Sequence, residues 1–241
     1  AARGDKKARK ALAALRARRP VEEAGMPSPT APLTATEQAW GVMRNGESPL
    51  AAQAIPTTVR ANNPAGDGAG AGQSEESISA LGDNVMAAWN DGQGFVVPGN
   101  GQGVGVSTDG GATWTDIGNP PIPAAYPSWA WTSDPVVCVD ESNGRFYYCG
   151  LGDPDASNNA IGVAYGHFSG AAFVWDGVSV VRTASNATTF LDKQWIAVDP
   201  ATHDVYVTNT TFTTTDWIDF YRSVDGGLTW SPRLPVPDNW S

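Results

Sequence analysis

The stretch SVDGGLTW, Ser223 to Trp230, repeats almost letter for letter a stretch that lies 116 residues earlier, STDGGATW, Ser107 to Trp114. In both stretches two glycines follow an aspartate, and glycine permits the positive φ angles of a tight turn. The aspartate carboxylate can accept hydrogen bonds from the N–H groups of that turn, and the tryptophan can fold back as an apolar plug between strands. The sequence therefore predicts that one type of hairpin occurs twice.

Short β-rich runs, separated by Asp, Asn, Gly and Pro, make up the sequence from residue 73 onward. Residues of the runs favour strands, and the separators favour turns. No convincing helical pattern lies between them, so the spacing predicts an all-β architecture. The candidate strands are NVMAAW, GVGVS, PVVCVD, RFYYCG, IGVAY, AAFVW, QWIAVD, DVYVTN, WIDFYRS and LTWSP.

A period of 58 residues underlies this pattern, because Glu76, Asp134 and Asp192 are spaced by 58 and the two DGG stretches by twice that number. Each period holds about four strands, which is typical of propeller blades. We therefore expect a β-propeller of four-stranded blades with about three blades present. Closed propellers have about four to eight blades, so six or so are expected in full, with further C-terminal blades or an oligomer closing the ring. The approximate blade ranges are 73–131, 132–190 and 191–241.

The residues before the blades differ in composition. Residues 1–20 hold eight of the fifteen basic residues and predict a disordered or helical basic tail. Residues 21–72 are rich in Pro, Ala and Gly and predict a linker, with a possible strand at 55–62. After residue 20 only seven basic residues face twenty-four acidic ones. This charge excludes nucleic acid as a partner of the body, and no apolar run is long enough for a membrane span.

The two DGG stretches match the pattern S-x-D-x-G-x-T-W, and the chain resembles the Asp-box (BNR repeat) propellers, in particular exported bacterial sialidase-like proteins. The resemblance implies a secreted, periplasmic or cell-surface protein that binds or hydrolyses glycans, with exo-sialidase activity. The alternative is a non-catalytic scaffold for protein or cell-surface interaction. In this family the box is structural and lies away from the ligand-binding mouth. The box residues here are Ser107, Asp109, Gly111, Trp114, Ser223, Asp225, Gly227 and Trp230.

The two cysteines lie on either side of a turn signal in PVVCVDESNGRFYYCG. If Asn143 and Gly144 are the two central residues of a hairpin, Cys138 lies opposite Cys149, and opposed residues can form a disulfide. A longer loop would shift that register, and two free thiols are the alternative. A disulfide would indicate an oxidising, exported setting.

The resemblance also places the start of each blade's first strand at the mouth of the central channel. An acidic group recurs there, and it either caps a strand start or binds a cation or the hydroxyls of a sugar. No cofactor is predicted, and a bound Ca²⁺ is possible but not indicated by any motif. The residues expected at this mouth are Glu75, Glu76, Asp91, Trp131, Asp134, Asp192 and Lys193.

Catalytic residues of the sialidases cannot be carried onto this sequence. Arg60 lies in TVRANNP, which is not the Phe/Tyr-Arg-Ile-Pro motif, and neither an arginine triad nor a Tyr/Glu pair can be placed. The only histidines, His167 and His203, do not allow a zinc cluster or a Ser-His-Asp arrangement. The sequence therefore leaves open whether the protein is an enzyme.

Overall fold

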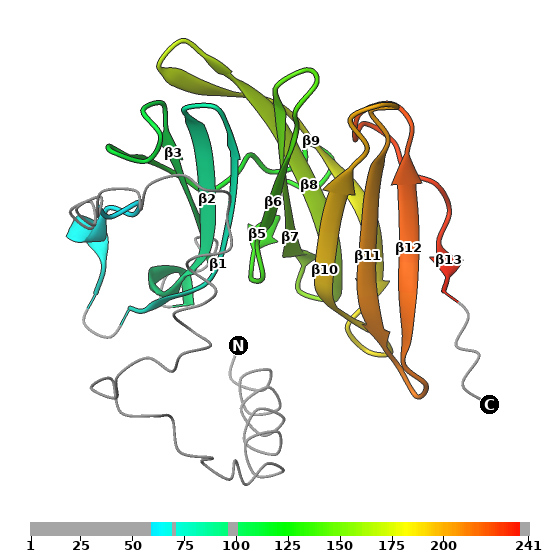
Figure 1. Cartoon of the computed structure of the whole chain (residues 1–241). Helices are drawn as coiled ribbons and strands as arrows, with labels where there is room; N and C mark the ends of the chain where they lie inside the picture. Colours follow the sequence, from blue (N-terminus) through cyan, green and yellow to red (C-terminus); the bar gives the residue numbers. More distant parts are fainter. Residues whose placement is uncertain (1–58, 69–70, 96–100, 237–241) are drawn as a thin grey trace, which may run out of the picture. The chain divides into compact units, whose positions relative to one another are not determined.

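The computed structural model describes residues 59–68, 71–95 and 101–236, and within them it contains three antiparallel β-sheets (Figure 1). The all-β class expected from the sequence is confirmed. The predicted basic tail and most of the predicted linker lie outside the described residues. Helical structure within the described ranges is limited to two 3₁₀ turns, Pro64–Gly66 and Gly92–Phe95. None of the helices found there could cross a membrane.

The first sheet has four strands in chain order: β1 (Gln73–Leu81), β2 (Asn84–Asp91), β3 (Gln102–Ser107) and β4 (Thr115–Gly118). A two-residue turn joins β1 to β2, and Gly82 adopts there a φ of 59°, which glycine tolerates without a steric cost. The stretch between β3 and β4 is the first DGG hairpin.

The second sheet has the order β5-β7-β8-β9, with β6 on the same edge of β7 as β5. Its strands are β5 (Ala130–Trp131), β6 (Val136–Asp140), β7 (Arg145–Asp155), β8 (Asn158–Ser169) and β9 (Ala172–Ser185). Strands β5 and β6 are therefore two parts of one interrupted inner strand. The fourth strand runs ten residues past Trp175, where the sequence pattern ended it.

The third sheet has four strands in chain order: β10 (Phe190–Val198), β11 (Val205–Phe212), β12 (Trp217–Ser223) and β13 (Leu234–Pro235). The stretch LTWSP, expected to be its last strand, instead belongs to the DGG hairpin and the segment after it. The first strands of the three sheets, β1, β6 and β10, lie side by side (Figure 1).

Two apolar clusters hold the sheets together. Met86 and Val104 of the first sheet pack against Tyr148 of the second, and Tyr147 of the second packs in one cluster with Tyr221 of the third. Successive residues of β7 therefore face opposite neighbours, because side chains alternate along a strand. The middle sheet is buried on both faces, which explains why FYYCG, the part of RFYYCG after Arg145, carries no charge and is buried throughout.

The strand expected at residues 55–62 is not found over 59–62, which are irregular, and 55–58 lie outside the described residues. The segment instead lies beside the first sheet, where the Asn63 N–H donates to Asp116 Oδ2 at 2.8 Å. It covers the flank that carries Trp89, whose indole lies across Gly103 with no room for a Cβ there.

The predicted disulfide is wrong, because both cysteines are free. The β6–β7 loop has four residues, since Asp140 pairs with Arg145, and the Gly144 N–H donates to the Asp140 carbonyl at 2.8 Å. Cys138 consequently faces Tyr147, and Cys149 faces Val136. Burial raises the pKa of Cys138 to about 12 and also raises that of Cys149, so both thiols stay protonated at neutral pH.

Candidate functional site at the channel mouth

The inner strand of each sheet is interrupted at the same place. Glu75, Asp134 and Lys193 have positive φ angles of 56°, 59° and 49°, and each lies where the pairing with the next strand shifts its register or breaks. Such angles are uncommon for residues other than glycine, and they cluster at functional sites. The equivalent positions are therefore 59 residues apart, and not the 58 that aligned Glu76 with Asp192.

Hydrogen bonds between neighbouring sheets hold these bulges in place. The Asp134 N–H donates to Asn90 Oδ1 of the first sheet at 2.8 Å, and the Gln194 amide of the third sheet donates to the Asp134 carbonyl. The Val137 N–H donates to Ser77 Oγ at 3.0 Å. The strained backbone is thus fixed from both sides.

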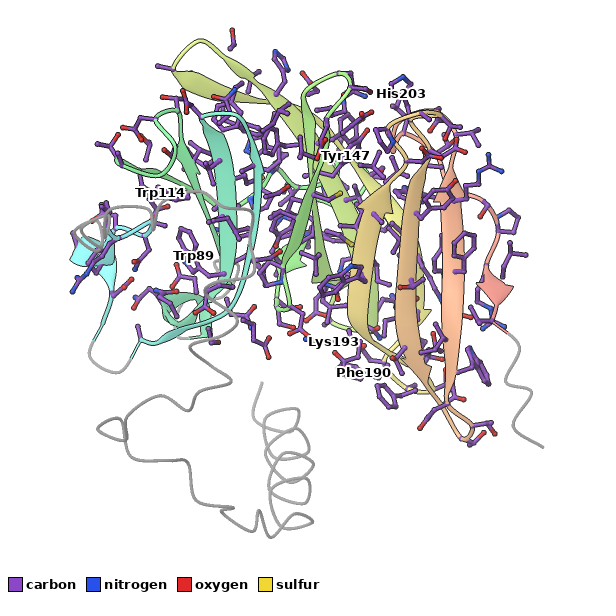
Figure 2. The ribbon with its side chains drawn as sticks, in the orientation of Figure 1. Trp89, Trp114, Tyr147, Phe190, Lys193 and His203 are labelled. Atoms are coloured by element: carbon purple, nitrogen blue, oxygen red, sulfur yellow. The ribbon has the colours of Figure 1, made fainter. Side chains whose placement is uncertain are left out.

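A pocket of about 150 Å³ lies between the three bulges, at the end of the inner strands that we call the mouth. It is lined by the same three positions of each strand, and Trp195 is 60% exposed there. Figure 2 shows Lys193 at this end of the sheets and His203 at the other. The lining residues are Glu75, Glu76, Ser77, Asp134, Pro135, Val136, Lys193, Gln194 and Trp195.

Two carboxyl groups in this pocket interact with each other. The pKa of Glu75 is raised, mainly because its carboxyl hydrogen bonds with the Asp134 side chain, and burial and the negative charge of Asp134 add to the effect. A hydrogen bond from Asn90 Nδ2 (2.7 Å to Glu75 Oε2) and the charge of Lys193 oppose it. Lys193 Nζ lies 3.8 Å from Asp134 Oδ2. The pocket thus combines an acid, a carboxylate and an ammonium group.

Three other predicted mouth residues do not line the pocket. Trp131 is only 1% exposed, and its Nε1–H donates to the Pro120 carbonyl at 3.1 Å, so this ring belongs to the core and not to the rim. Asp91 accepts from the Gln93 N–H at 2.9 Å and closes a turn. Asp192 accepts from the N–H of the next residue at 2.8 Å, and burial raises its pKa.

The first DGG hairpin is held by hydrogen bonds within itself. Asp109 Oδ1 accepts from Ser107 Oγ at 2.7 Å and from the Thr113 N–H at 2.8 Å, and the Gly111 N–H donates to Ser107 Oγ at 2.9 Å. The hydrogen bonds from Thr113 and Ser107 lower the pKa of Asp109 to about 2. Its carboxylate is therefore committed to the turn.

The second DGG hairpin repeats this pattern. Asp225 Oδ1 accepts from Ser223 Oγ at 2.7 Å and from the Thr229 N–H at 2.9 Å, and the Gly227 N–H donates to Ser223 Oγ at 2.8 Å. The hydrogen bonds from Thr229 lower the pKa of Asp225 to about 2.

The tryptophans of the two hairpins are half-buried but differ in their partners. Trp114 Nε1–H donates to the Gly111 carbonyl of its own hairpin at 3.0 Å. Trp230 Nε1–H donates at 3.0 Å to Ser179 Oγ of the second sheet, and its ring packs against the core between the second and third sheets. Only the second tryptophan therefore joins two sheets.

The arginines after residue 60 are engaged in ion pairs away from the pocket. Arg182 pairs with the buried Asp219 and bridges the second and third sheets. The other pairs are Arg145–Asp176, Arg222–Asp204 and Arg233–Asp219. Among the residues that the structure describes, no arginine lines the mouth pocket, and no group of His, Cys, Asp or Glu side chains is arranged to hold a metal ion.

Sequence reasoning missed the buried amides that support the mouth. Asn90, Gln102 and Gln194 are each at most 5% exposed, and each binds a neighbouring sheet or strand through its side chain. A polar residue within a strand looks like a solvent-facing position in the sequence. Only the weak alternation of NVMAAWND could have indicated that Asn90 is buried.

No protein-family model and no curated protein matches the chain, but solved structures match its fold. It is similar to the GH93 α-L-arabinofuranosidase of Fusarium graminearum with arabinobiose (16% identity, TM-score 0.51) and to the α-L-arabinanase of Penicillium chrysogenum with arabinobiose (14%, 0.53). It is also similar to a protein of unknown function from Dyadobacter fermentans (18%, 0.51).

These matches cover 68% of this chain and 48%, 49% and 50% of the three structures, so the chain spans about half their length. The two enzymes among them are five-bladed β-propellers. At these identities the likeness concerns the fold, and it supports a propeller-like arrangement of the three sheets.

Proposed function

We propose that this chain belongs to a glycoside hydrolase of the β-propeller type, which binds a glycan at the mouth pocket and cleaves a glycosidic bond there. The observation that carries the proposal is the interacting carboxyl pair of Glu75 and Asp134, held at strained bulges of two adjacent inner strands. Perturbed carboxyl groups in a pocket are candidates for general acid and base catalysis. The arabinan-acting neighbours with arabinobiose support the choice of a glycan.

Glu75 is the proposed general acid. Its raised pKa favours the protonated form, which can donate a proton to the leaving glycosidic oxygen. Asp134 hydrogen bonds directly with Glu75. The two carboxyl groups are therefore closer than the roughly 5 to 9.5 Å that separate the two principal carboxyl groups of most glycosidases. Asp134 therefore supports the acid and does not act as a nucleophile. The remaining acid of the lining, Glu76, is the candidate to activate water.

Two further side chains fit a sugar. Trp195 offers an exposed indole face at the pocket, and aromatic faces pack well against the apolar faces of sugar rings. Lys193 can donate to ring hydroxyls while its charge is balanced by Asp134.

The proposal differs in one respect from the expectation based on the Asp-box resemblance. A sialidase binds the substrate carboxylate with arginines, and the described part of this pocket has none. We therefore propose a glycan other than a sialoside. The exported location, the closure of the ring and the alternative of a non-catalytic scaffold stay predictions.

The test is a hydrolysis assay of the full chain with p-nitrophenyl α-L-arabinofuranoside, arabino-oligosaccharides, other neutral glycosides and a fluorogenic sialoside. Glu75→Gln and Asp134→Asn should each lower turnover by roughly 10²- to 10⁴-fold, because the first removes the proposed acid and the second removes its carboxyl partner. Glu141→Gln is the matched control, since Glu141 is an exposed acid at the other end of the inner strands. Its turnover should equal that of the parent.

An equal loss of turnover in all three variants would overturn the proposed role of the mouth. If the parent chain binds a glycan without cleaving it, the mouth would still be a binding site, and the non-catalytic alternative would be supported. Turnover of the sialoside alone would contradict the proposed substrate class.

A further inference from the structure

A chain of buried side chains leads from the core to the mouth. The Tyr148 hydroxyl donates to Gln102 Oε1, Gln102 Nε2 donates to Asn90 Oδ1 at 3.0 Å, and Asn90 Nδ2 donates to Glu75 Oε2 at 2.7 Å. Tyr148 is fully buried and the two amides nearly so. Every donor points toward the mouth, and hydrogen bonds aligned in this way strengthen one another in a low dielectric.

The orientation of the Asn90 amide follows from its partners. Two N–H groups, the Gln102 amide and the Asp134 backbone, point at the same Asn90 atom, with distances of 3.0 and 2.8 Å. Only the carbonyl oxygen can accept both, so the NH₂ group must face Glu75. One side chain thus binds the Glu75 carboxyl and the backbone of Asp134, which lie on different sheets.

We infer that Asn90 is a positioning residue, which holds the Glu75 carboxyl beside the backbone of Asp134 and leaves Glu75 Oε1 as the atom that carries the acid proton. This inference rests on the proposed function of the mouth. Because Glu75 Oε2 accepts the Asn90 N–H, the acid proton belongs on Oε1. No other amide among the described residues is hydrogen bonded in this way to both members of the pair.

The charged groups around Glu75 decide how strongly this donor acts. Its protonated form is favoured by Asp134, and its charged form by the Asn90 donor and by Lys193. Asp192 and Glu76 also lie near this end of the inner strands. Of the two groups that favour the charged form, the Asn90 donor has the larger effect, so its loss should shift the balance further toward the protonated form.

The variant Asn90→Asp tests this, because it keeps the acceptor for Gln102 and Asp134 and replaces the donor by an acceptor. A second carboxyl against Glu75 should raise the pKa of Glu75 by about one to two units, as like charges do. The measurement is a ¹³C NMR pH titration of labelled Glu75 in the full chain, together with the pH profile of glycan hydrolysis. The limb of that profile that reports the acid should move to higher pH by the same amount.

The matched control is Asn159→Asp, a buried asparagine that donates to the Ala184 and Thr189 carbonyls and has no hydrogen bond to a carboxylate of the described residues. It should lower the melting temperature and leave the titration of Glu75 unchanged. Gln102→Leu gives a second arm if Asn90→Asp does not fold, since it removes one of the two donors that orient the Asn90 amide. It should shift the Glu75 titration by less than Asn90→Asp, in the same direction.

An unchanged Glu75 titration in folded Asn90→Asp, or in Gln102→Leu if the first variant is unfolded, would overturn the inference. The NMR readout needs no substrate. A shifted titration in a chain that cleaves no glycan would therefore support the role of Asn90 and count against the proposed function alone.

Discussion

The sheets of this protein carry carboxylates at both ends, and the two ends differ in what is repeated. At the distal end, Asp109 and Asp225 have the same neighbours in sequence, the same hydrogen bonds and the same lowered pKa of about 2. At the mouth, the backbone conformation repeats three times, but the side chains are Glu75, Asp134 and Lys193.

This difference separates scaffold from site. The identical aspartates of the two hairpins accept hydrogen bonds from the amides of their own turns, so their carboxylates are not available to bind a ligand. A repeated backbone with three different side chains brings an acid, a carboxylate and an ammonium group to one point. The conspicuous sequence repeat therefore marks the hairpins, and the proposed site lies at the end where the side chains do not repeat.

The largest expected effect distinguishes tryptophans at the two ends. Trp230→Ala should lower the free energy of unfolding by about 3 kcal/mol, because the ring is half-buried between two sheets. Trp195→Ala should leave stability nearly unchanged and weaken glycan binding up to roughly tenfold through lost stacking. Urea denaturation and calorimetric titration measure the two quantities. Loss of glycan binding in folded Trp230→Ala would contradict the division of roles between the two ends of the sheets.

A smaller effect concerns the pH dependence of stability, which should have opposite signs at the two ends. The folded pKa of Asp225 lies below its unfolded value, so its stabilisation is complete above that value and is lost as the pH falls toward 2. The folded pKa of Glu75 lies above its unfolded value, so its contribution is present at low pH and is lost as the pH rises through the folded value.

Asp225→Ala and Glu75→Gln separate these contributions. Asp225→Ala should lower the melting temperature by roughly 2 to 4 °C near neutral pH and flatten the loss of stability toward pH 2. Glu75→Gln should remove the loss of stability with rising pH that Glu75 causes, at pH values just above the ordinary pKa range of carboxyl groups. Melting curves between pH 2 and 7 provide the measurement, and slopes of the same sign for both residues would contradict the comparison.

The sequence was sufficient for the features that depend on local chemistry. Alternating β-branched and aromatic runs between turn residues predicted the antiparallel sheets. The neighbouring enzymes support a propeller-like fold. The position of the mouth at the start of the inner strands came from the resemblance, and the structure places Glu75, Glu76, Asp134 and Lys193 together there.

Features that depend on register could not be read from the sequence. A four-residue loop replaced the expected two-residue turn and moved Cys138 away from Cys149. The bulges shifted the repeat by one residue, so Asp192 was aligned where Lys193 lies. Trp131 is buried in the core and does not line the mouth, where the sequence pattern had placed it. Each of these outcomes is set by contacts between segments far apart in the chain.

The most direct test of the account is hydrogen–deuterium exchange of the chain with and without saturating arabinobiose, the ligand in two of the similar structures. It reports on both ends of the sheets in one experiment. The account predicts added protection at residues 75–77, 134–136 and 193–195, with exchange at 109–113 and 225–229 unchanged. Protection confined to the two DGG hairpins would contradict it.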